Sequence, residues 1–294
     1  MRLDTVSLWV AAARPSTLGL AVTPVMVGTA LAWAADRNIH GLAVLAAFAG
    51  GVLIQAGTNL HNDAADSERG GDGPDRLGPP RVTAAGLISG RNIKRGARLC
   101  FATAALLGLY LVFIGGWPIL MLGILSILSG WAYTGGPFPI AYTPFGELFV
   151  VAFFGPGAVC GTYWLCSGSI DAASLAGGVA LGLLAGAVLL VNNYRDVEAD
   201  MRVGRRTLAV LAGPQMTAWI YAAFILLPFA LLPLIGHGQP HGHVWPAFAT
   251  LPVALALIYR FMREPRGRVF NQILVRTVHM QFLFGFLLSV GLGL

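Results

Sequence analysis

Two short acidic segments carry the side chains of this sequence that are best suited to metal and phosphate chemistry. Their candidate oxygen ligands are Asn62, Asp63, Asp66, Asp72, Asn192, Asp196 and Asp200. Residues four apart share one face of a helix, so the repeated Asn-x-x-x-Asp step predicts an amide beside a carboxylate in each segment. Converging carboxylates need a cation, because two unit charges about 4 Å apart repel by about 4 kcal/mol at an effective dielectric of about 20. Oxygen ligands that share an ion with substrate phosphates are typical of Mg²⁺.

Basic residues lie among these acidic groups. The arginine candidates for diphosphate binding are Arg69, Arg76, Arg81, Arg195 and Arg205. Arginine binds phosphate oxygens through a planar fork, so arginine beside carboxylate indicates a substrate that brings phosphate to a metal ion. Tyr133 is a further candidate, because it ends a long apolar segment on the same predicted membrane face. The combination predicts a magnesium-dependent site for a phosphate ester.

A plainer alternative is that these polar residues only cap helices where the chain leaves a membrane. The step recurs, however, and each copy directly follows an apolar stretch, 51–57 in one case and 182–190 in the other. Ionisable groups at membrane depth are costly and usually functional. The repetition therefore favours two halves of one site over two decorated loops.

The elements that must position these residues are membrane-spanning helices. Of the 294 residues, 56% are hydrophobic and 11% are charged, which is about half the charged share of a soluble domain. Apolar segments of about 20 residues recur along the chain, and a helix pairs its own backbone groups in lipid. The predicted spans are 15–35, 39–60, 97–115, 117–134, 145–166, 172–193, 208–235, 245–262 and 277–294. The sequence therefore predicts an all-α polytopic membrane protein with nine transmembrane helices.

The distribution of Lys and Arg predicts the orientation of these helices. With nine spans and a cytoplasmic N-terminus, every Lys and Arg except Arg37 falls on the cytoplasmic side. This asymmetry follows the positive-inside rule. We therefore expect a multi-pass protein of the plasma (inner) membrane, with both acidic segments at the cytoplasmic face.

Several other functions are disfavoured by the sequence. The net charge of +6 arises from short loops between spans rather than from one soluble face, so we expect no nucleic-acid partner. No obligate protein partner is evident. Cys100, Cys160 and Cys166 lack ligand spacing and are expected to be packing residues. The histidines near 237–243 lie on the predicted far side, away from the carboxylates.

The two acidic motifs resemble those of the UbiA-type intramembrane prenyltransferases. The matching residues are Asn62-Asp63-x-x-Asp66, followed by Asp72, and Asn192-Asn193-x-Arg195-Asp196-x-x-x-Asp200. Segments 13–18, 75–81, 133–137, 146–148 and 204–210 resemble the branch that acts on 1,4-dihydroxy-2-naphthoate. One position departs from the pattern, since that family usually has Lys where this chain has Arg205. The resemblance covers nearly the whole chain.

This resemblance implies a single domain over 1–294, with helices around a central cavity and acidic cytoplasmic segments at 59–81 and 192–208. It implies that Mg²⁺ and the Asp motifs bind a polyprenyl diphosphate, with Asp66 and Asp196 as catalytic residues and Arg14 as a further diphosphate ligand. The implied reaction transfers the polyprenyl chain to 1,4-dihydroxy-2-naphthoate with decarboxylation. The product would be demethylmenaquinol, an intermediate of menaquinone biosynthesis.

Three alternatives remain open at this point. A UbiA-type enzyme could use another aromatic acceptor, such as 4-hydroxybenzoate, homogentisate or haem. A transporter would distribute polar residues through the depth of the bilayer, whereas here they gather at one face. A membrane CDP-alcohol phosphotransferase would carry an Asp-Gly-x-x-Ala-Arg start that is missing here. Phe149, Phe153 and Phe154 could line a prenyl groove or simply pack between helices, and Glu147 could cap a helix or take up a proton.

Overall fold

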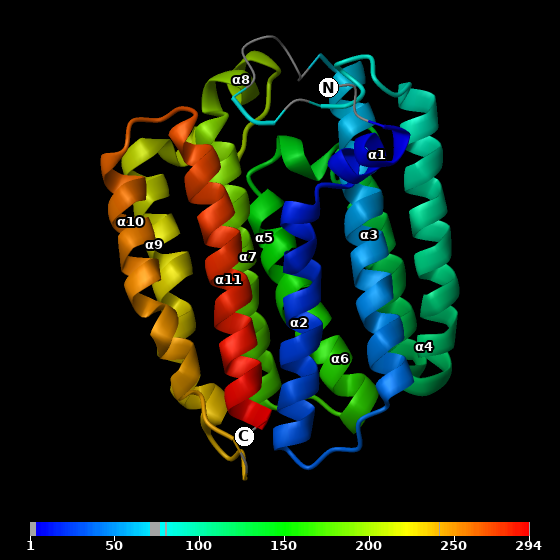
Figure 1. Cartoon of the computed structure of the whole chain (residues 1–294), viewed down its shortest axis with the longest axis vertical. Coiled ribbons are helices and arrows are strands. Elements are labelled where there is room, and N and C mark those ends of the chain that lie inside the picture. The colour runs from blue at the N-terminus through cyan, green and yellow to red at the C-terminus, as the bar shows by residue number, and fades with distance from the viewer. Residues whose placement is uncertain (1–3, 71–76, 80, 241, 294) are drawn as a thin grey trace.

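The computed structural model describes residues 4–70, 77–79, 81–240 and 242–293, and in these residues it is a bundle of helices without strands (Figure 1). The helices in chain order are α1 (Thr5–Ala13), α2 (Pro15–Ala34), α3 (Gly41–Glu68), α4 (Gly90–Ala132), α5 (Gly146–Ala152), α6 (Ala158–Ser167), α7 (Ala172–Arg195), α8 (Val197–Arg202), α9 (Leu208–Gly236), α10 (Leu251–Arg263) and α11 (Val269–Gly293). Short segments of other helix types lie at Ile140–Tyr142, Phe153–Gly157 and Trp245–Thr250. The predicted all-α class is confirmed.

Local sequence signals explain where several helices begin. Asp171 and Ser174 form a capping box at the start of α7, in which each side chain bonds to the other residue's backbone N–H. Ser89 accepts a hydrogen bond from the backbone of Asn92 at the start of α4. Pro15 occupies the first position of α2, where its missing N–H costs no helical hydrogen bond. These caps fix helix starts before any tertiary contact forms.

Eight helical segments in the described part of the chain are long and apolar enough to cross a membrane. One of them, α4, contains 43 residues and would be about 65 Å long if straight, about twice the thickness of the hydrocarbon. It breaks at Gly116, whose φ of 69° and ψ of −156° are not helical. Lys94, near the start of α4, contacts Glu68 of α3. Thr134, just after the end of α4, contacts Asn62, which also lies on α3. The chain therefore reverses inside α4, which supplies the third and fourth predicted spans.

Three helices continue well beyond the predicted span limits, and one of them is α4, which begins at Gly90 rather than at residue 97. The second span was expected to end at residue 60, but α3 continues to Glu68, so the first acidic motif is helical throughout. The last span was expected to begin at residue 277, but α11 begins at Val269 and places Arg276 and His279 inside the helix. Hydropathy detects where side chains leave the lipid, whereas backbone hydrogen bonding extends a helix beyond that point.

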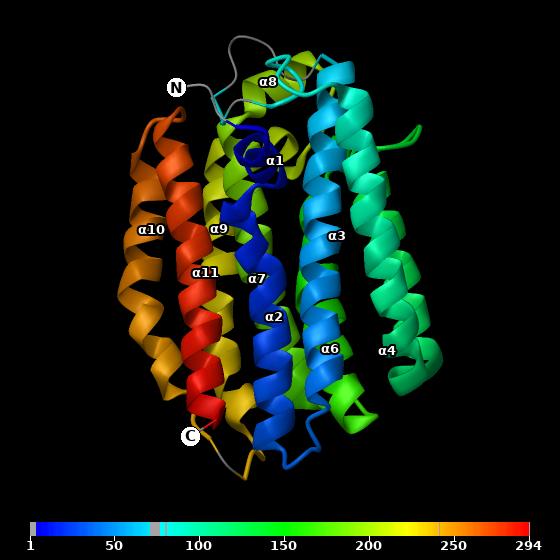
Figure 2. The same cartoon turned by 45° about the vertical axis from the view of Figure 1, so that its right-hand side comes forward.

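Helix α7 lies inside the bundle, packed against α9, α11 and α5 (Figures 1 and 2). Small residues permit its close approach to the irregular segment Phe153–Gly157. A Cβ atom added at Gly182 would lie 2.4 Å from the carbonyl oxygen of Val151. This packing buries the last turn of α7, which carries the first residues of the second acidic motif, inside the bundle.

Candidate metal and diphosphate site

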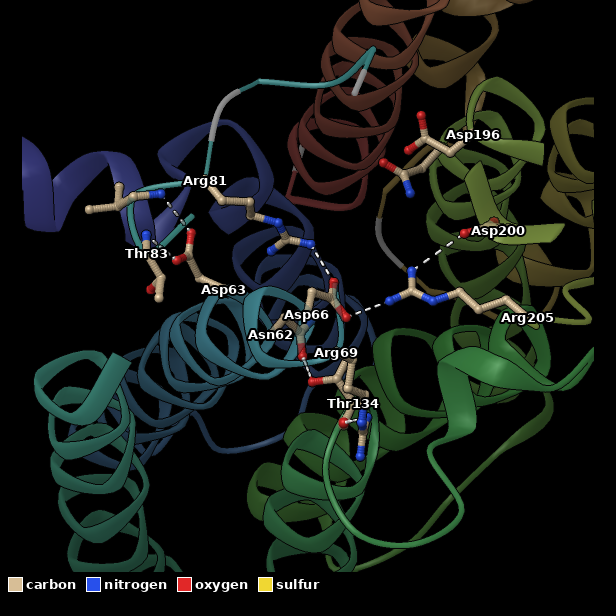
Figure 3. A network of polar contacts seen from close by, with 12 residues as sticks. Asn62, Asp63, Asp66, Arg69, Arg81, Thr83, Thr134, Asp196, Asp200 and Arg205 are labelled. Atoms are coloured by element: carbon tan, nitrogen blue, oxygen red, sulfur yellow. Dashed lines mark hydrogen bonds and ion pairs between the residues drawn. The ribbon is translucent and has the colours of Figure 1, made fainter. Parts of the chain in front are cut away.

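The two acidic motifs meet at one end of the bundle through Arg205, which follows α8 (Figure 3). One terminal nitrogen of Arg205 donates to Asp66 on α3, and the other lies 3.4 Å from Oδ1 of Asp200 on α8. The backbone N–H of Arg205 also donates to the carbonyl oxygen of Asp200, at 2.8 Å. The structure thus brings together carboxylates that are far apart in the sequence.

Asp66 is a buried carboxylate that contacts two arginines. It is 3% exposed, and its Oδ2 lies 2.6 Å from a terminal nitrogen of Arg81, which is 7% exposed. Its other oxygen accepts from Arg205. A buried carboxylate must be compensated by positive charge, and here two guanidinium groups provide it.

Asp63 and Asn62 lie one helical turn earlier on α3. Their side chains accept hydrogen bonds from backbone N–H groups and a hydroxyl, whereas Asp66 contacts arginines. The Asp63 carboxylate accepts hydrogen bonds from the backbone N–H groups of Val82, at 3.2 Å, and Thr83, at 2.9 Å. Oδ1 of Asn62 accepts from the hydroxyl of Thr134, at 2.6 Å. Asp63 therefore anchors the loop that carries Arg81 in place.

Arg195 organises the second motif and is only 2% exposed. Its guanidinium contacts both carboxylate oxygens of Asp196, at 2.8 and 2.5 Å, and Oδ1 of Asn192 at 2.9 Å. Its remaining terminal nitrogen donates to Oδ1 of Asn271 on α11, at 2.7 Å. The side chain that we expected to bind diphosphate therefore also sets the orientation of Asn192 and Asp196.

The predicted helical column of Asn192, Asp196 and Asp200 is interrupted. Helix α7 ends at Arg195, and Asp196 has a φ of −99° and a ψ of 11°, after which α8 begins. The Asp200 side chain faces Arg205, although its backbone N–H still donates to the carbonyl oxygen of Asp196, at 2.9 Å. Side-chain spacing predicted the approach of these residues to one site, but not the bend between them.

The electrostatics of this cluster favour a bound cation. Burial, with a smaller effect of Asp196, raises the pKa of Asp200 to about 7, against the opposing effect of Arg205. Burial alone would lower the pKa of Arg205, but Asp66 and Asp200 raise it well above its usual value. Arg205 therefore remains cationic.

The donor set fits a hard divalent cation. Asp66 and Asp200 present carboxylates from separate helices toward a shared position, and the Arg205 guanidinium now lies between them. Among the described residues, no three Asp, Glu, His or Cys side chains form a cluster able to hold a metal ion. Asp72 and Arg76, two further predicted ligands, lie outside the described residues. Asp66 and Asp200 therefore supply oxygen atoms of the kind that such an ion prefers.

Sequence reasoning missed two residues of this cluster. The Arg205 guanidinium lies 4.7 Å from the centre of the Tyr142 ring, which stacks beneath it. Asn271 bonds Arg195 and also donates to the carbonyl oxygen of Leu77, at 2.8 Å, and so ties α11 to the loop after the first motif. The sequence offered two signals for these residues. Tyr142 is an aromatic residue in a Pro-rich loop, and Asn271 is an amide residue at the edge of an apolar run.

The other predicted ligands occupy the margins of the site. Arg14 adopts a left-handed conformation, with a φ of 55°, between α1 and α2. Asn59 of α3 holds this junction in place by donating to the carbonyl oxygen of Ala13, at 2.9 Å. Arg69 points elsewhere: it donates to the backbone carbonyls of Thr134 and, at 2.9 Å, Gly136. The structure brings Arg81, Arg195 and Arg205 to the carboxylates, but not Arg69.

An apolar cavity of about 430 Å³ begins beside this cluster and is walled by α2, α3, α4 and the segment from α5 to α6. Tyr133 lines it, while the next residue, Thr134, hydrogen-bonds Asn62 of the first motif. Phe149, Phe153 and Phe154 also line the cavity, so these rings are wall residues and not only packing between helices. A polar end and an apolar body suit an amphiphile with a charged head.

Glu147 lies at the start of α5, as predicted, and is 2% exposed. Its Oε1 accepts a hydrogen bond from Nδ2 of Asn193 on α7, at 2.9 Å. No partner within the described residues contacts its Oε2. The pair therefore joins α5 to the residue that follows Asn192 of the second motif.

Comparison with known proteins gives a consistent result. Residues 21–285 match the UbiA prenyltransferase family. The 1,4-dihydroxy-2-naphthoate octaprenyltransferase of Mycobacterium tuberculosis (strain ATCC 25618 / H37Rv) is 38% identical, over 85% of this chain and 83% of the relative. The enzyme of the same description from Escherichia coli (strain K12) is 33% identical, over 100% of this chain and 97% of the relative.

Solved structures show the same fold at lower sequence identity. A UbiA homolog from Archaeoglobus fulgidus bound to DMAPP and Mg²⁺ superimposes with a TM-score of 0.64 and 16% identity, over 96% of this chain and 99% of the other. The apo structure of a UbiA homolog from Aeropyrum pernix K1 gives a TM-score of 0.69 and 13% identity, over 92% and 96%. The helical arrangement described above is therefore shared with these proteins.

Proposed function

This chain belongs to the UbiA prenyltransferase family, and on that premise we propose that it transfers a polyprenyl chain from a polyprenyl diphosphate to 1,4-dihydroxy-2-naphthoate. The acceptor loses its carboxylate in the reaction and becomes demethylmenaquinol, an intermediate of menaquinone biosynthesis. The relatives that share 31–38% identity over most of the chain support this acceptor.

The observation that carries the proposal is the junction of the acidic cluster with the apolar cavity. Arg205 joins Asp66 and Asp200, while Tyr133 and Thr134 connect the cavity wall to Asn62. This arrangement supports a prenyl diphosphate whose diphosphate lies among the arginines and whose hydrocarbon extends into the cavity. A water-soluble substrate would need no such apolar chamber.

We propose that Asp66, Asp196 and Asp200 are the principal metal ligands, with Asn62 and Asn192 beside them. Mg²⁺ bound there would neutralise negative charge on the departing diphosphate. Arg81 and Arg205 would donate to diphosphate oxygens once they release Asp66, and Arg195 would hold Asp196 in position. Some hydrogen-bond donors interact more strongly as negative charge develops on the diphosphate. They lower the activation barrier more than donors that bind the substrate and the transition state equally well. Asp63 accepts two backbone hydrogen bonds, which hold it in place beside these ligands.

The bond changes follow from this arrangement. The allylic C–O bond breaks, and its electron pair leaves with the diphosphate. The ring carbon of the acceptor that carries the carboxylate attacks the allylic carbon, and a new C–C bond forms. Loss of carbon dioxide then returns an electron pair to the ring. The apolar cavity walls, including Phe149 and Phe153, would keep water away from the allylic cation.

We also propose that the whole chain acts as one domain in the plasma (inner) membrane, with the acidic cluster at the cytoplasmic face. The gathering of all basic residues except Arg37 on one predicted side supports this orientation. Labelling of cysteines introduced at Arg37 and Arg266 with an impermeant reagent, in intact cells, tests it. We expect labelling at position 37 alone, and labelling at 266 would contradict the orientation.

The test of function is to supply the purified protein with Mg²⁺, a polyprenyl diphosphate and each candidate acceptor in turn. We expect prenylated product and carbon dioxide from 1,4-dihydroxy-2-naphthoate. If 4-hydroxybenzoate or homogentisate gives product while the naphthoate gives none, the proposed acceptor is wrong, although prenyl transfer stands. If no acceptor is prenylated, the proposed reaction is wrong.

A further inference from the structure

A second cavity, of about 460 Å³, lies against a different face of α3 from Asp66, between this helix and α4. We name it the α3–α4 basic pocket. The residues that matter in its wall are His61, Glu68, Arg69, Lys94, Arg98 and Trp131. None of the carboxylates assigned above to the metal site lines it, so it is a separate chamber.

The charge of the α3–α4 basic pocket is positive and only partly neutralised. Lys94 pairs with Glu68, at 2.6 Å, and Glu68 is the one carboxylate among the described residues of the wall. Arg69 donates to two backbone carbonyls, which carry no net charge, and Arg98 donates to the carbonyl oxygen of Lys94, at 3.3 Å. Within the described residues neither arginine forms an ion pair. The positive charges of Arg69 and Arg98 are therefore not neutralised by a carboxylate within the described residues.

The surroundings of the pocket identify where that anion comes from. The pocket lies where α3 ends and α4 begins, at the same end of the bundle as the acidic cluster. Trp131 at its rim is 46% exposed, and beside the rim Leu99 is 69% exposed and Leu128 is 56% exposed. Apolar side chains so exposed on a membrane helix face lipid. Indole rings and basic residues gather at the level of the lipid headgroups.

We propose that the α3–α4 basic pocket binds the headgroup phosphate of an anionic phospholipid, whose acyl chains lie along the exposed apolar surface of α4. Arg98 and Arg69 supply charge-assisted donors to the phosphate, and Lys94 adds a third cation beside them. Trp131 packs against the glycerol region at the rim. Basic pockets between membrane helices bind anionic headgroups by this chemistry.

The wall is also shaped by close packing on the side of α3. A Cβ atom at Gly135 would lie 2.7 Å from Nε2 of His61 and 2.5 Å from the carbonyl oxygen of Trp131. No hydrogen-bond partner in the described residues contacts this His61 nitrogen. Because residue 135 is glycine, the loop that follows α4 can pack closely against the His61 imidazole, and no side chain at position 135 fills the pocket.

The test compares lipid binding by the full-length purified protein and by two arginine variants of α4. Arg98→Gln removes a pocket cation, whereas Arg95→Gln removes an exposed arginine of the same helix that does not line the pocket. Native mass spectrometry and thermal unfolding are measured during titration with phosphatidylglycerol, phosphatidylcholine or inorganic phosphate. We expect phosphatidylglycerol alone to bind tightly, and Arg98→Gln to weaken that binding about fivefold.

Three results would overturn the proposal. They are equal binding of phosphatidylcholine, equal protection by inorganic phosphate, and an equal loss of binding in Arg95→Gln. Lys94→Gln serves as a second pocket variant if Arg98→Gln does not yield folded protein. The measurement is of lipid binding and involves no prenyl transfer, so its outcome is independent of the proposed reaction.

Discussion

The Arg205 guanidinium bonds the carboxylate of Asp66, a residue 139 positions earlier in the chain. The same side chain reaches Asp200 and lies over the Tyr142 ring. It therefore occupies the position between two carboxylates where a divalent cation would fit. On the proposed function, substrate binding exchanges the Arg205 guanidinium for a metal ion at this position, which has measurable consequences.

Replacing Asp66 by Asn removes the counter-charge of both Arg81 and Arg205 together with a proposed metal ligand. We expect prenyl transfer to fall on the order of a hundredfold or more. Loss of one partner from a buried ion pair also costs about 3–5 kcal/mol of stability. Initial rates and thermal unfolding measure the two effects. Glu198→Gln is the control, since its exposed carboxylate pairs with Arg266 and with no other basic side chain in the described residues, and activity there should be retained.

Substitution at Arg205 separates charge from geometry. Arg205→Lys retains a cation but cannot bridge two carboxylates with a planar fork, so we expect activity within about tenfold of the natural chain. Arg205→Ala should raise the KM for prenyl diphosphate by about a hundredfold, since a charged donor to phosphate is lost. Arg206→Ala, an exposed neighbour, provides the comparison. Equal effects of Arg205→Ala and Arg206→Ala on KM would refute a role in diphosphate binding.

The position of Arg205 predicts that metal and diphosphate bind cooperatively. Mg²⁺ alone must displace a guanidinium held by Asp66 and Asp200, whereas a diphosphate offers that guanidinium a new partner. We expect Mg²⁺ and a prenyl diphosphate together to raise the unfolding temperature by more than the sum of their separate effects. Chelation with EDTA should abolish both the extra stabilisation and the activity. Purely additive shifts would contradict the exchange.

The buried pair of Glu147 and Asn193 predicts a stability effect. Asn193→Ala leaves a carboxylate that is 2% exposed without its one hydrogen-bond partner in the described residues. We expect a loss of about 1–3 kcal/mol, seen as a lower unfolding temperature. Adding Glu147→Leu should recover part of that loss, because no buried polar group is then left unpaired. A double variant less stable than Asn193→Ala would show that the pair does not act this way.

Close helix packing predicts a further effect at Gly182. Alanine there would place its Cβ 2.4 Å from the carbonyl oxygen of Val151, so α7 and α5 must separate. We expect Gly182→Ala to cost about 1–3 kcal/mol of stability. Gly19→Ala is matched, because its Cβ would meet only Phe282, at an ordinary 3.8 Å. Similar unfolding temperatures for the two variants would contradict this account.

Much of the fold follows from the sequence because its signals are local. The length of each apolar run determines a membrane-crossing helix, and the predicted reversal between 115 and 117 coincides with the break at Gly116. The limits of α3 and α11 did not follow, since a helix ends where its backbone hydrogen bonds end. Those bonds continue past the end of the apolar run.

The amino-acid sequence by itself determined the helical membrane class, the paired acidic motifs and the kind of ligand that they suit, because composition and four-residue spacing are properties of single segments. The tertiary structure decided which partners each side chain has. It brought Arg205 to Asp66, turned Arg69 toward Thr134, and added Asn271 from α11 and Tyr142 from a loop. Spacing fixes which residues share a helix face, but the rotation of one helix against another depends on how all their side chains pack together.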